Sequence, residues 1–373
     1  MFADAAATAS VVDEMALPGI PRVESPLFDS ISREVPLTPE ERRIAQSLRE
    51  DGFAIIDFPD PDFELRSERI KRRLAAMFGI DLADRESVRH ASGNLRVQDA
   101  WRFDEDVKAI AANPQILALL SALYGRRAFP FQTLSFPVGS QQALHSDAVH
   151  FSSIPQGFMC GVWVALEDIR ADAGPLMYLP GSHRWPVLTN SLVGRRGWNV
   201  EQPSAQAPFE RAWEALLEGS GAQPQTLVAS KGQTLIWAAN LLHGGEPQRD
   251  RSLTRWSQVT HYYFENCIYY TPAFSDEPLG LLDLRTVTNV ATGETEPNLY
   301  AGEEVRRVVT DPPRRGLRWL RRRLFGLNAS DLPADFDPAG YQLLNPDVAA
   351  SGLSPADHYL QLGRSQGRQY SLK

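Results

Sequence analysis

The stretch that decides the fold of this chain is HSDAVHF, residues 145–151, in which one residue separates His145 from Asp147. The surrounding residues are typical of β-strands, where alternate side chains point to the same face. We therefore expect His145 and Asp147 to bind one ion, with His243, which follows an apolar run, as the third ligand. Two imidazoles and one carboxylate leave three positions of an octahedral ion open, which is how non-haem Fe(II) binds an organic co-substrate and O2. The three residues are thus the predicted metal ligands and catalytic centre.

A β-rich half surrounds this stretch. From about residue 128 to residue 268, short runs of Phe, Val, Trp, Tyr and Thr alternate with Gly, Pro, Asp and Asn. The number of runs suits a double-sheet jelly roll, the architecture of cupin-like barrels. The expected strands lie near 130–137, 143–151, 158–167, 174–179, 225–229, 233–238, 242–247 and 254–264.

Helices precede the β-rich half, which makes the predicted fold class α+β. Thr38 to Glu41 form a capping box with proline at the first helical position, and the helix ends at Asp51 before Gly52. A strand follows from Phe53 to Phe58. Further helices are expected over 61–79 and from Asn113 to Gly125, whereas residues 1–36 are expected to be an irregular N-terminal arm.

Residues 184–224 interrupt the strand pattern with a tryptophan-containing, partly helical insertion. It is too long for a plain hairpin loop, and long insertions often serve as lids or binding loops. We expect it to form part of the substrate wall.

Arg255 begins another strand-like run beyond His243. A guanidinium offers a fixed fork of donors that matches a carboxylate, so Arg255 would hold the distal carboxylate of 2-oxoglutarate. Ser257 lies two residues on, on the same strand face, and could add a hydroxyl group. The alternative is that Arg255 is a surface charge among Arg249 and Arg251, but the metal triad favours the carboxylate clamp.

The composition of the chain excludes several other classes of protein. The chain has 373 residues, 43% of them hydrophobic and 23% charged, enough for a full core. Its net charge of -8 argues against a general nucleic-acid binder, which needs clustered Lys and Arg. Cys160 and Cys267 form neither a disulfide framework nor a CxxC zinc site, so a reducing cytoplasm is expected. We expect no export signal and no transmembrane segment.

An ordered series of motifs resembles the phytanoyl-CoA dioxygenase (PhyH) family of Fe(II)/2-oxoglutarate oxygenases over roughly 50–268. The resemblance implies a double-stranded β-helix, iron on His145, Asp147 and His243, O2 as oxidant, and 2-oxoglutarate on Arg255. It also places Gln132 and Thr133 at positions that often touch the co-substrate. Because Asp147 is retained, hydroxylation is favoured over halogenation. The motifs are GSQQ (139–142), HSD (145–147), WVALED (163–168), AGPL (173–176), LPGSH (179–183), GQTLIW (232–237) and HGG (243–245).

Two further residues have alternative interpretations. His150 follows the metal pair closely and could face substrate, although such a residue in a barrel wall also serves packing. Trp163 could border the iron pocket, whereas a tryptophan in a buried strand usually belongs to the core.

The C-terminal part has two predicted units. Within a linker over 301–333, residues 314–325 resemble a basic amphipathic helix that could touch a membrane surface or an acidic partner; the alternative is a solvated linker helix. Residues 334–373 resemble a small helical module of bacterial surface-polysaccharide and glycosyltransferase-associated proteins. This resemblance indicates a bacterial source and a glycan or cell-envelope substrate.

The resulting hypothesis is an Fe(II)- and 2-oxoglutarate-dependent dioxygenase, with its catalytic domain over 37–300, that hydroxylates a small-molecule, carrier-linked or glycan-linked substrate. A cupin-like metal-dependent isomerase or hydrolase would keep the triad but would not need Arg255. A non-catalytic scaffold acting through the C-terminal module would not need the triad. Release of succinate distinguishes the first hypothesis. The sequence predicts neither the substrate nor the oligomeric state.

Overall fold

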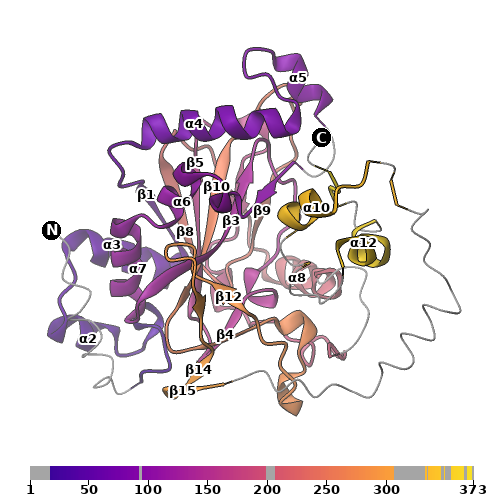
Figure 1. Cartoon of the computed structure of the whole chain (residues 1–373). Coiled ribbons are helices and arrows are strands. Elements are labelled where there is room, and N and C mark those ends of the chain that lie inside the picture. The colour runs from indigo at the N-terminus through magenta and orange to yellow at the C-terminus, as the bar shows by residue number, and fades with distance from the viewer. Residues whose placement is uncertain are drawn as a thin grey trace, which may run out of the picture.

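The structure is a computed structural model that describes residues 17–91, 95–198 and 206–305, and in the C-terminal part 332–333, 335–345, 348, 354–364 and 368–371. Its centre is an antiparallel sheet that runs through the middle of the molecule (Figure 1). In spatial order the sheet consists of β1 (Phe53–Asp57), β8 (Gln233–Ala238), β5 (Met159–Ala165), β10 (Ser257–Phe264), β3 (Ala128–Phe136) and β2 (Val97–Gln98). Every residue of β5 and β10 is buried, because both faces of the sheet are covered.

Smaller antiparallel sheets oppose the main sheet. One consists of β7 (Gln225–Leu227), β6 (Leu176–Tyr178) and β9 (His243–Gly245), and another pairs β4 (Ser152–Ile154) with β11 (Ile268–Tyr270). An apolar cluster that includes Trp163, Leu176 and Trp237 joins side chains of the main sheet to side chains of the β6 sheet. The arrangement is the predicted jelly roll, and the α+β class is confirmed.

Helices of the N-terminal part flank the main sheet. They are α2 (Phe28–Glu34), α3 (Pro39–Asp51), α4 (Phe63–Ala75), α5 (Arg85–His90), α6 (Glu105–Ala111) and α7 (Pro114–Tyr124). Of these, α3, α6 and α7 pack against the strands of the main sheet. The predicted capping box is present, since Thr38 Oγ1 accepts from Glu41 N–H and a Glu41 carboxylate oxygen accepts from Thr38 N–H. Gly52 and Gly125 end α3 and α7 in the left-handed conformation, with φ of 84° and 77°.

The remaining elements are short. The insertion contains α8 (Ala207–Ser220), whose Phe209 and Trp213 are buried. Two hairpins follow the barrel, β12 (Val287–Thr288) with β13 (Thr295–Glu296) and β14 (Leu299–Tyr300) with β15 (Glu303–Glu304). Single turns of 3-10 helix lie at Arg22–Glu24, Ala76–Phe78, Ala100–Arg102, Asp147–Val149, Ala171–Ala173, Ser182–Arg184, Pro272–Phe274 and Glu277–Leu279.

The structure corrects two expectations. Part of the N-terminal arm is a helix rather than irregular, because α2 buries Phe28 and Ser32 against the core. Residues 143–151 do not form a strand: His145 makes one isolated β-bridge and Asp147 begins a 3-10 turn. The helix expected over 61–79 forms as α4 and a following 3-10 turn.

One stretch bears on the expectation that no segment spans a membrane. By length and composition alone, Glu105–Tyr124 could cross a membrane. This is weak support for a span, because 56% of the tested window is buried inside the protein. The structure divides the stretch into α6 and α7, with Asn113 as the side-chain cap of α7.

A charged network connects α4 to α6. Asp106 accepts from Arg66, Arg69 and Arg73 of α4, and Asp104 accepts from Arg73 at 2.7 and 2.8 Å. The guanidinium of Arg69, followed by those of Arg73 and Arg66, holds the pKa of Asp106 well below its usual range. These contacts hold α4 against α6.

The C-terminal part contains α10 (Pro338–Leu344), α12 (Pro355–His358) and a π-helical turn at Tyr359–Gly363. Tyr341, Val348 and Tyr359 form a small core, and Tyr341 Oη lies 2.9 Å from His358 Nδ1. The predicted basic helix over 314–325 lies outside the described residues. The short core agrees with a small helical unit.

Candidate metal centre and co-substrate pocket

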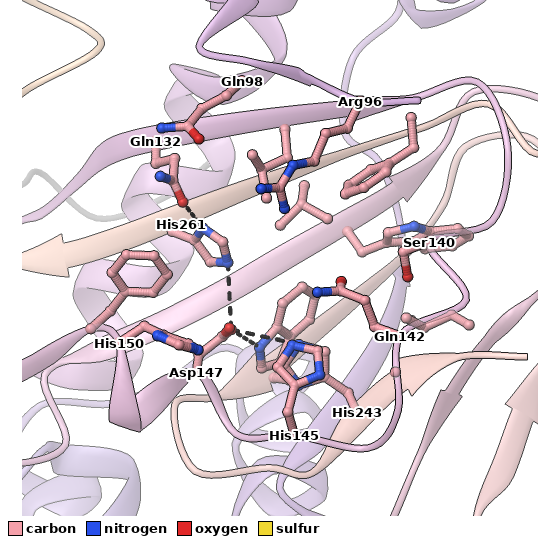
Figure 2. Close-up of a pocket in the computed structure, with 18 of the residues that line it drawn as sticks. Arg96, Gln98, Gln132, Ser140, Gln142, His145, Asp147, His150, His243 and His261 are labelled. Atoms are coloured by element: carbon pink, nitrogen blue, oxygen red, sulfur yellow. Dashed lines mark hydrogen bonds and ion pairs between the residues drawn. The ribbon is translucent and has the colours of Figure 1, made fainter. Parts of the chain in front are cut away.

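The three predicted ligands come together in one buried site. His145 and His243 form a β-bridge, in which each backbone N–H donates to the other's carbonyl at 2.9 Å. One ligand atom from each of His145, Asp147 and His243 lies within 4.8 Å of the others. Figure 2 shows these side chains converging on one side of a pocket. His145 and Asp147 therefore reach the same site, as expected from their spacing. The backbone that carries them is an isolated bridge followed by a turn and not a continuous strand.

Backbone carbonyls orient both imidazoles. His145 Nδ1 lies 2.9 Å from Ala143 O, and His243 Nδ1 lies 3.0 Å from Leu241 O. A carbonyl oxygen can only accept, so each Nδ1 carries the hydrogen and each Nε2 keeps its lone pair. Metal-binding histidines are typically fixed in this way. The donor set thus fits a divalent cation without rearrangement.

The charge states also suit a cation. Burial lowers the pKa of His145 to about 4, with a smaller contribution from His243. Burial would raise the pKa of Asp147, but His243 and His261 hold it well below the usual range. Near neutral pH the site therefore presents a neutral His145 and an ionised Asp147, the forms that bind metals.

Trp237 supports the carboxylate from the main sheet. Its indole Nε1 donates to Asp147 Oδ2 at 2.8 Å. Gly161 lies opposite Trp237 on β5, and a Cβ at this position would lie only 2.2 Å from the indole ring. Trp237 can therefore reach Asp147 only because residue 161 has no side chain. This contact was not predicted from the sequence, since it joins residues on three separate segments.

His261 is a further site residue that the sequence analysis missed. Its Nε2 lies 3.4 Å from Asp147 Oδ2, and its Nδ1 lies 2.9 Å from Gln132 Oε1. His261 is 3% exposed. The available signal was strand alternation, because Arg255, Ser257, Val259 and His261 are alternate residues of one strand.

Arg255 lies deep in the same pocket. Its side chain is 2% exposed, its Nη1 donates to Ser257 Oγ at 3.2 Å, and its Nε has no hydrogen-bond partner. Burial lowers the pKa of Arg255 to about 10, so the group remains charged near neutral pH. An arginine buried to this degree normally has an anionic partner. No salt bridge to Arg255 occurs among the residues that the structure describes.

The pocket has a volume of about 340 Å³. Besides the triad and Arg255, it is lined by the predicted residues Gln132, His150 and Trp163. Burial lowers the pKa of His150 to about 4, so this residue too is neutral near neutral pH. Ser257 touches Arg255 but does not line the cavity, and Thr133 lies outside the lining with its buried hydroxyl unpartnered. Gln206, which precedes α8, brings the insertion to the pocket.

A jelly roll with two histidines and one aspartate in this arrangement is typical of non-haem iron dioxygenases that use 2-oxoglutarate. The chain belongs to the phytanoyl-CoA dioxygenase (PhyH) family, whose sequence profile matches residues 42–253, more than half of its length. The match contains all three metal ligands and ends two residues before Arg255.

Individual relatives are distant. The peroxisomal phytanoyl-CoA dioxygenase of Rattus norvegicus is 23% identical over 252 residues, covering 62% of this chain and 70% of the rat protein. Phytanoyl-CoA dioxygenase domain-containing protein 1 of Danio rerio is 44% identical over 94 residues, covering 22% of this chain and 32% of that protein.

The chain is also similar to solved structures at low sequence identity. EctD from S. alaskensis with bound Fe is 19% identical, with a TM-score of 0.46 over 61% of this chain and 77% of that one. The epimerase SnoN in complex with Fe3+, alpha ketoglutarate and nogalamycin RO is 20% identical, with a TM-score of 0.45 over 62% and 86% of the two chains.

Proposed function

We propose that the protein is a hydroxylase in which His145, Asp147 and His243 hold Fe(II) and Arg255 holds the distal carboxylate of 2-oxoglutarate. Arg255 carries the proposal, because its charged guanidinium is buried in the metal pocket with Nε unpartnered and, among the described residues, makes no salt bridge, although the Glu167 carboxylate is close enough to act on its charge. A five-carbon dicarboxylate that chelates the metal supplies the missing anion. The guanidinium fork matches this carboxylate in shape and charge.

Bound Fe(II) and 2-oxoglutarate supply the oxidation, in which O2 converts 2-oxoglutarate to succinate and CO2 and adds one oxygen atom to a substrate C–H bond. The chain's own residues bind, orient and exclude water. Trp237 and His261 both contact Oδ2 of the Asp147 carboxylate, and the Ala143 and Leu241 carbonyls fix the imidazoles. Ser257 orients Arg255 through the 3.2 Å hydrogen bond.

The insertion over 184–224 is proposed as a wall of the substrate chamber. Gln206 lines the pocket and lies 3.5 Å from His150 Nε2 through its Oε1. The α8 helix behind it is fixed in an apolar cluster by Phe209 and Trp213. The substrate is proposed to be a small molecule, free or attached to a carrier or glycan, which enters beside His150.

The test is an anaerobic titration of Fe(II)-loaded protein with 2-oxoglutarate, following the weak visible charge-transfer band of the chelate. We expect a saturable band in the wild type and a much weaker response in Arg255→Met. The exposed Arg251→Met serves as the matched control, since it removes a nearby arginine outside the pocket. Absence of a band from protein that demonstrably holds iron would favour a cupin-like isomerase or hydrolase.

A further inference from the structure

We propose that Gln98, Gln132 and His261 form the substrate wall of the pocket, and that this wall selects a hydroxyl-bearing, sugar-like molecule that is neutral or anionic. The inference rests on the proposed function, because it assumes that the Arg255 end of the pocket is taken by 2-oxoglutarate. It assigns Gln132 to substrate and not to the co-substrate.

The pairing of β10 with β3 divides the pocket along its length. Ser257, next to Arg255, pairs with Phe136, and Val259 pairs with Leu134. The last pocket-facing pair is His261 with Gln132. Arg255 and His261 are six residues apart, so about 20 Å of strand separates the two ends. The pocket therefore has an arginine end, a middle in which apolar side chains lie beside the Arg96 guanidinium, and an amide–imidazole end (Figure 2).

The co-substrate fits one side of this division. Between Arg255 and the metal ligands, Leu134, Phe136 and Val259 present hydrocarbon to the cavity. Such side chains match the two methylene groups of 2-oxoglutarate. His261 and Gln132 lie beyond this apolar middle, beside Asp147, where the second reactant must approach the metal.

The far wall is rich in hydrogen-bonding groups. Gln132 Oε1 and His261 Nδ1 are joined at 2.9 Å, and Gln98 lies beside Gln132 on the neighbouring strand (Figure 2). A side-chain amide offers two donor hydrogens and two acceptor lone pairs, so one such bond leaves most of the capacity of Gln132 open. Gln142 and Gln206 add two more amides to the lining. Hydroxyl groups, which both donate and accept, are the natural complement.

An acyl chain would fit this wall poorly. Each amide group buried against hydrocarbon without a partner costs free energy, because the hydrogen bonds that it made to water are not replaced. The sole carboxylate among the described lining residues is Asp147, which the proposed function assigns to the metal, so a cationic substrate would lack a partner. Phe151, whose ring centroid is 5.0 Å from that of His261, adds a flat apolar surface of the kind that packs against a sugar ring.

The first test separates the two reactants. In Gln132→Leu, which keeps the side-chain volume and removes the amide, we expect the 2-oxoglutarate concentration at half-saturation of the charge-transfer band to change less than about twofold. The matched control is Ser135→Ala on the same strand, since Ser135 is buried outside the pocket and its hydroxyl has no partner. A loss of 2-oxoglutarate affinity of about tenfold or more in Gln132→Leu, but not in Ser135→Ala, would overturn the assignment.

The second test uses binding of chosen probes to full-length protein loaded with Zn(II) and 2-oxoglutarate. Saturation-transfer NMR compares methyl glucoside, glucuronate and N-acetylglucosamine with octanoate at about 10 mM, a range that detects weak complexes. We expect binding by one or more sugars and not by octanoate, and about a tenfold loss in Gln98→Leu and in Gln132→Leu. Binding of octanoate alone, or no binding of any sugar, overturns the inference. Absence of the 2-oxoglutarate band in the wild type would instead refute the proposed function.

Discussion

Replacing Arg255 by methionine is expected to weaken co-substrate binding while leaving the empty protein as stable as before, or slightly more stable. Methionine fills most of the volume of the arginine stem but offers no charge. A charge-assisted hydrogen bond contributes about 1.5–3 kcal/mol, and a guanidinium fork can make two with one carboxylate. A net loss of about 3 kcal/mol corresponds to a fall in 2-oxoglutarate affinity of about 150-fold.

The stability of the empty protein is expected to change in the opposite sense. There the Arg255 guanidinium is buried with its Nε unpartnered, and burial lowers its pKa to about 10. Apolar replacement of a buried charge is often neutral or stabilising. Thermal unfolding without iron or 2-oxoglutarate should therefore give a Tm for Arg255→Met equal to or above that of the wild type.

The assay is the anaerobic titration with 2-oxoglutarate, run on the wild type, Arg255→Met and Arg251→Met with equal iron loading. Unchanged affinity in Arg255→Met would refute the carboxylate clamp. A large fall in the Tm of the empty variant would show that Arg255 is structural, and would make its loss of affinity uninformative.

Three other outcomes are expected. Asp147→Ala should abolish iron-dependent succinate formation while circular dichroism shows an intact fold. Full activity of this variant would refute the assignment of Asp147 as a metal ligand. Gly161→Ala should weaken metal binding at least about tenfold, measured by isothermal titration with Mn(II), because its Cβ displaces Trp237 from Asp147; unchanged binding would show that this contact is dispensable. Asp106→Asn should lower the free energy of unfolding by about 1–2 kcal/mol at pH 7 after allowance for half-exposed arginines. Because folding lowers the pKa of Asp106, with Arg69 as the main cause, this contribution exists above the unfolded pKa of about 4 and is lost as pH falls. Urea unfolding at pH 7 and pH 3 checks this, and an equal difference at both pH values would contradict it.

The sequence was most informative where residue chemistry alone restricts the possibilities. His145, Asp147 and His243 could be predicted because few structures need this ligand set, even though the strand expected to carry the first two is a bridge and a turn. The helix after Thr38 was predictable because its caps lie within a few residues of one another.

Other parts of the site could not be predicted, because they depend on contacts between segments that are far apart in the sequence. Alternation alone would put His261 on the face of Arg255, but its approach to Asp147 is a contact with a segment more than a hundred residues earlier in the chain. The Trp237 contact needs Gly161 on a different strand. Gln132 and Thr133 were both expected at the co-substrate, but adjacent residues of a strand face opposite sides, and of the two only Gln132 lines the pocket.

The backbone bridge between His145 and His243 affects how the protein can recover after it loses its iron. Two of its hydrogen bonds join the segments that carry the ligands, and neither involves the metal. If the iron is oxidised and dissociates, the ligand residues would therefore keep their positions. A fresh ferrous ion could enter without refolding of the chain, so inactivation by air should be reversed by reductant and iron alone.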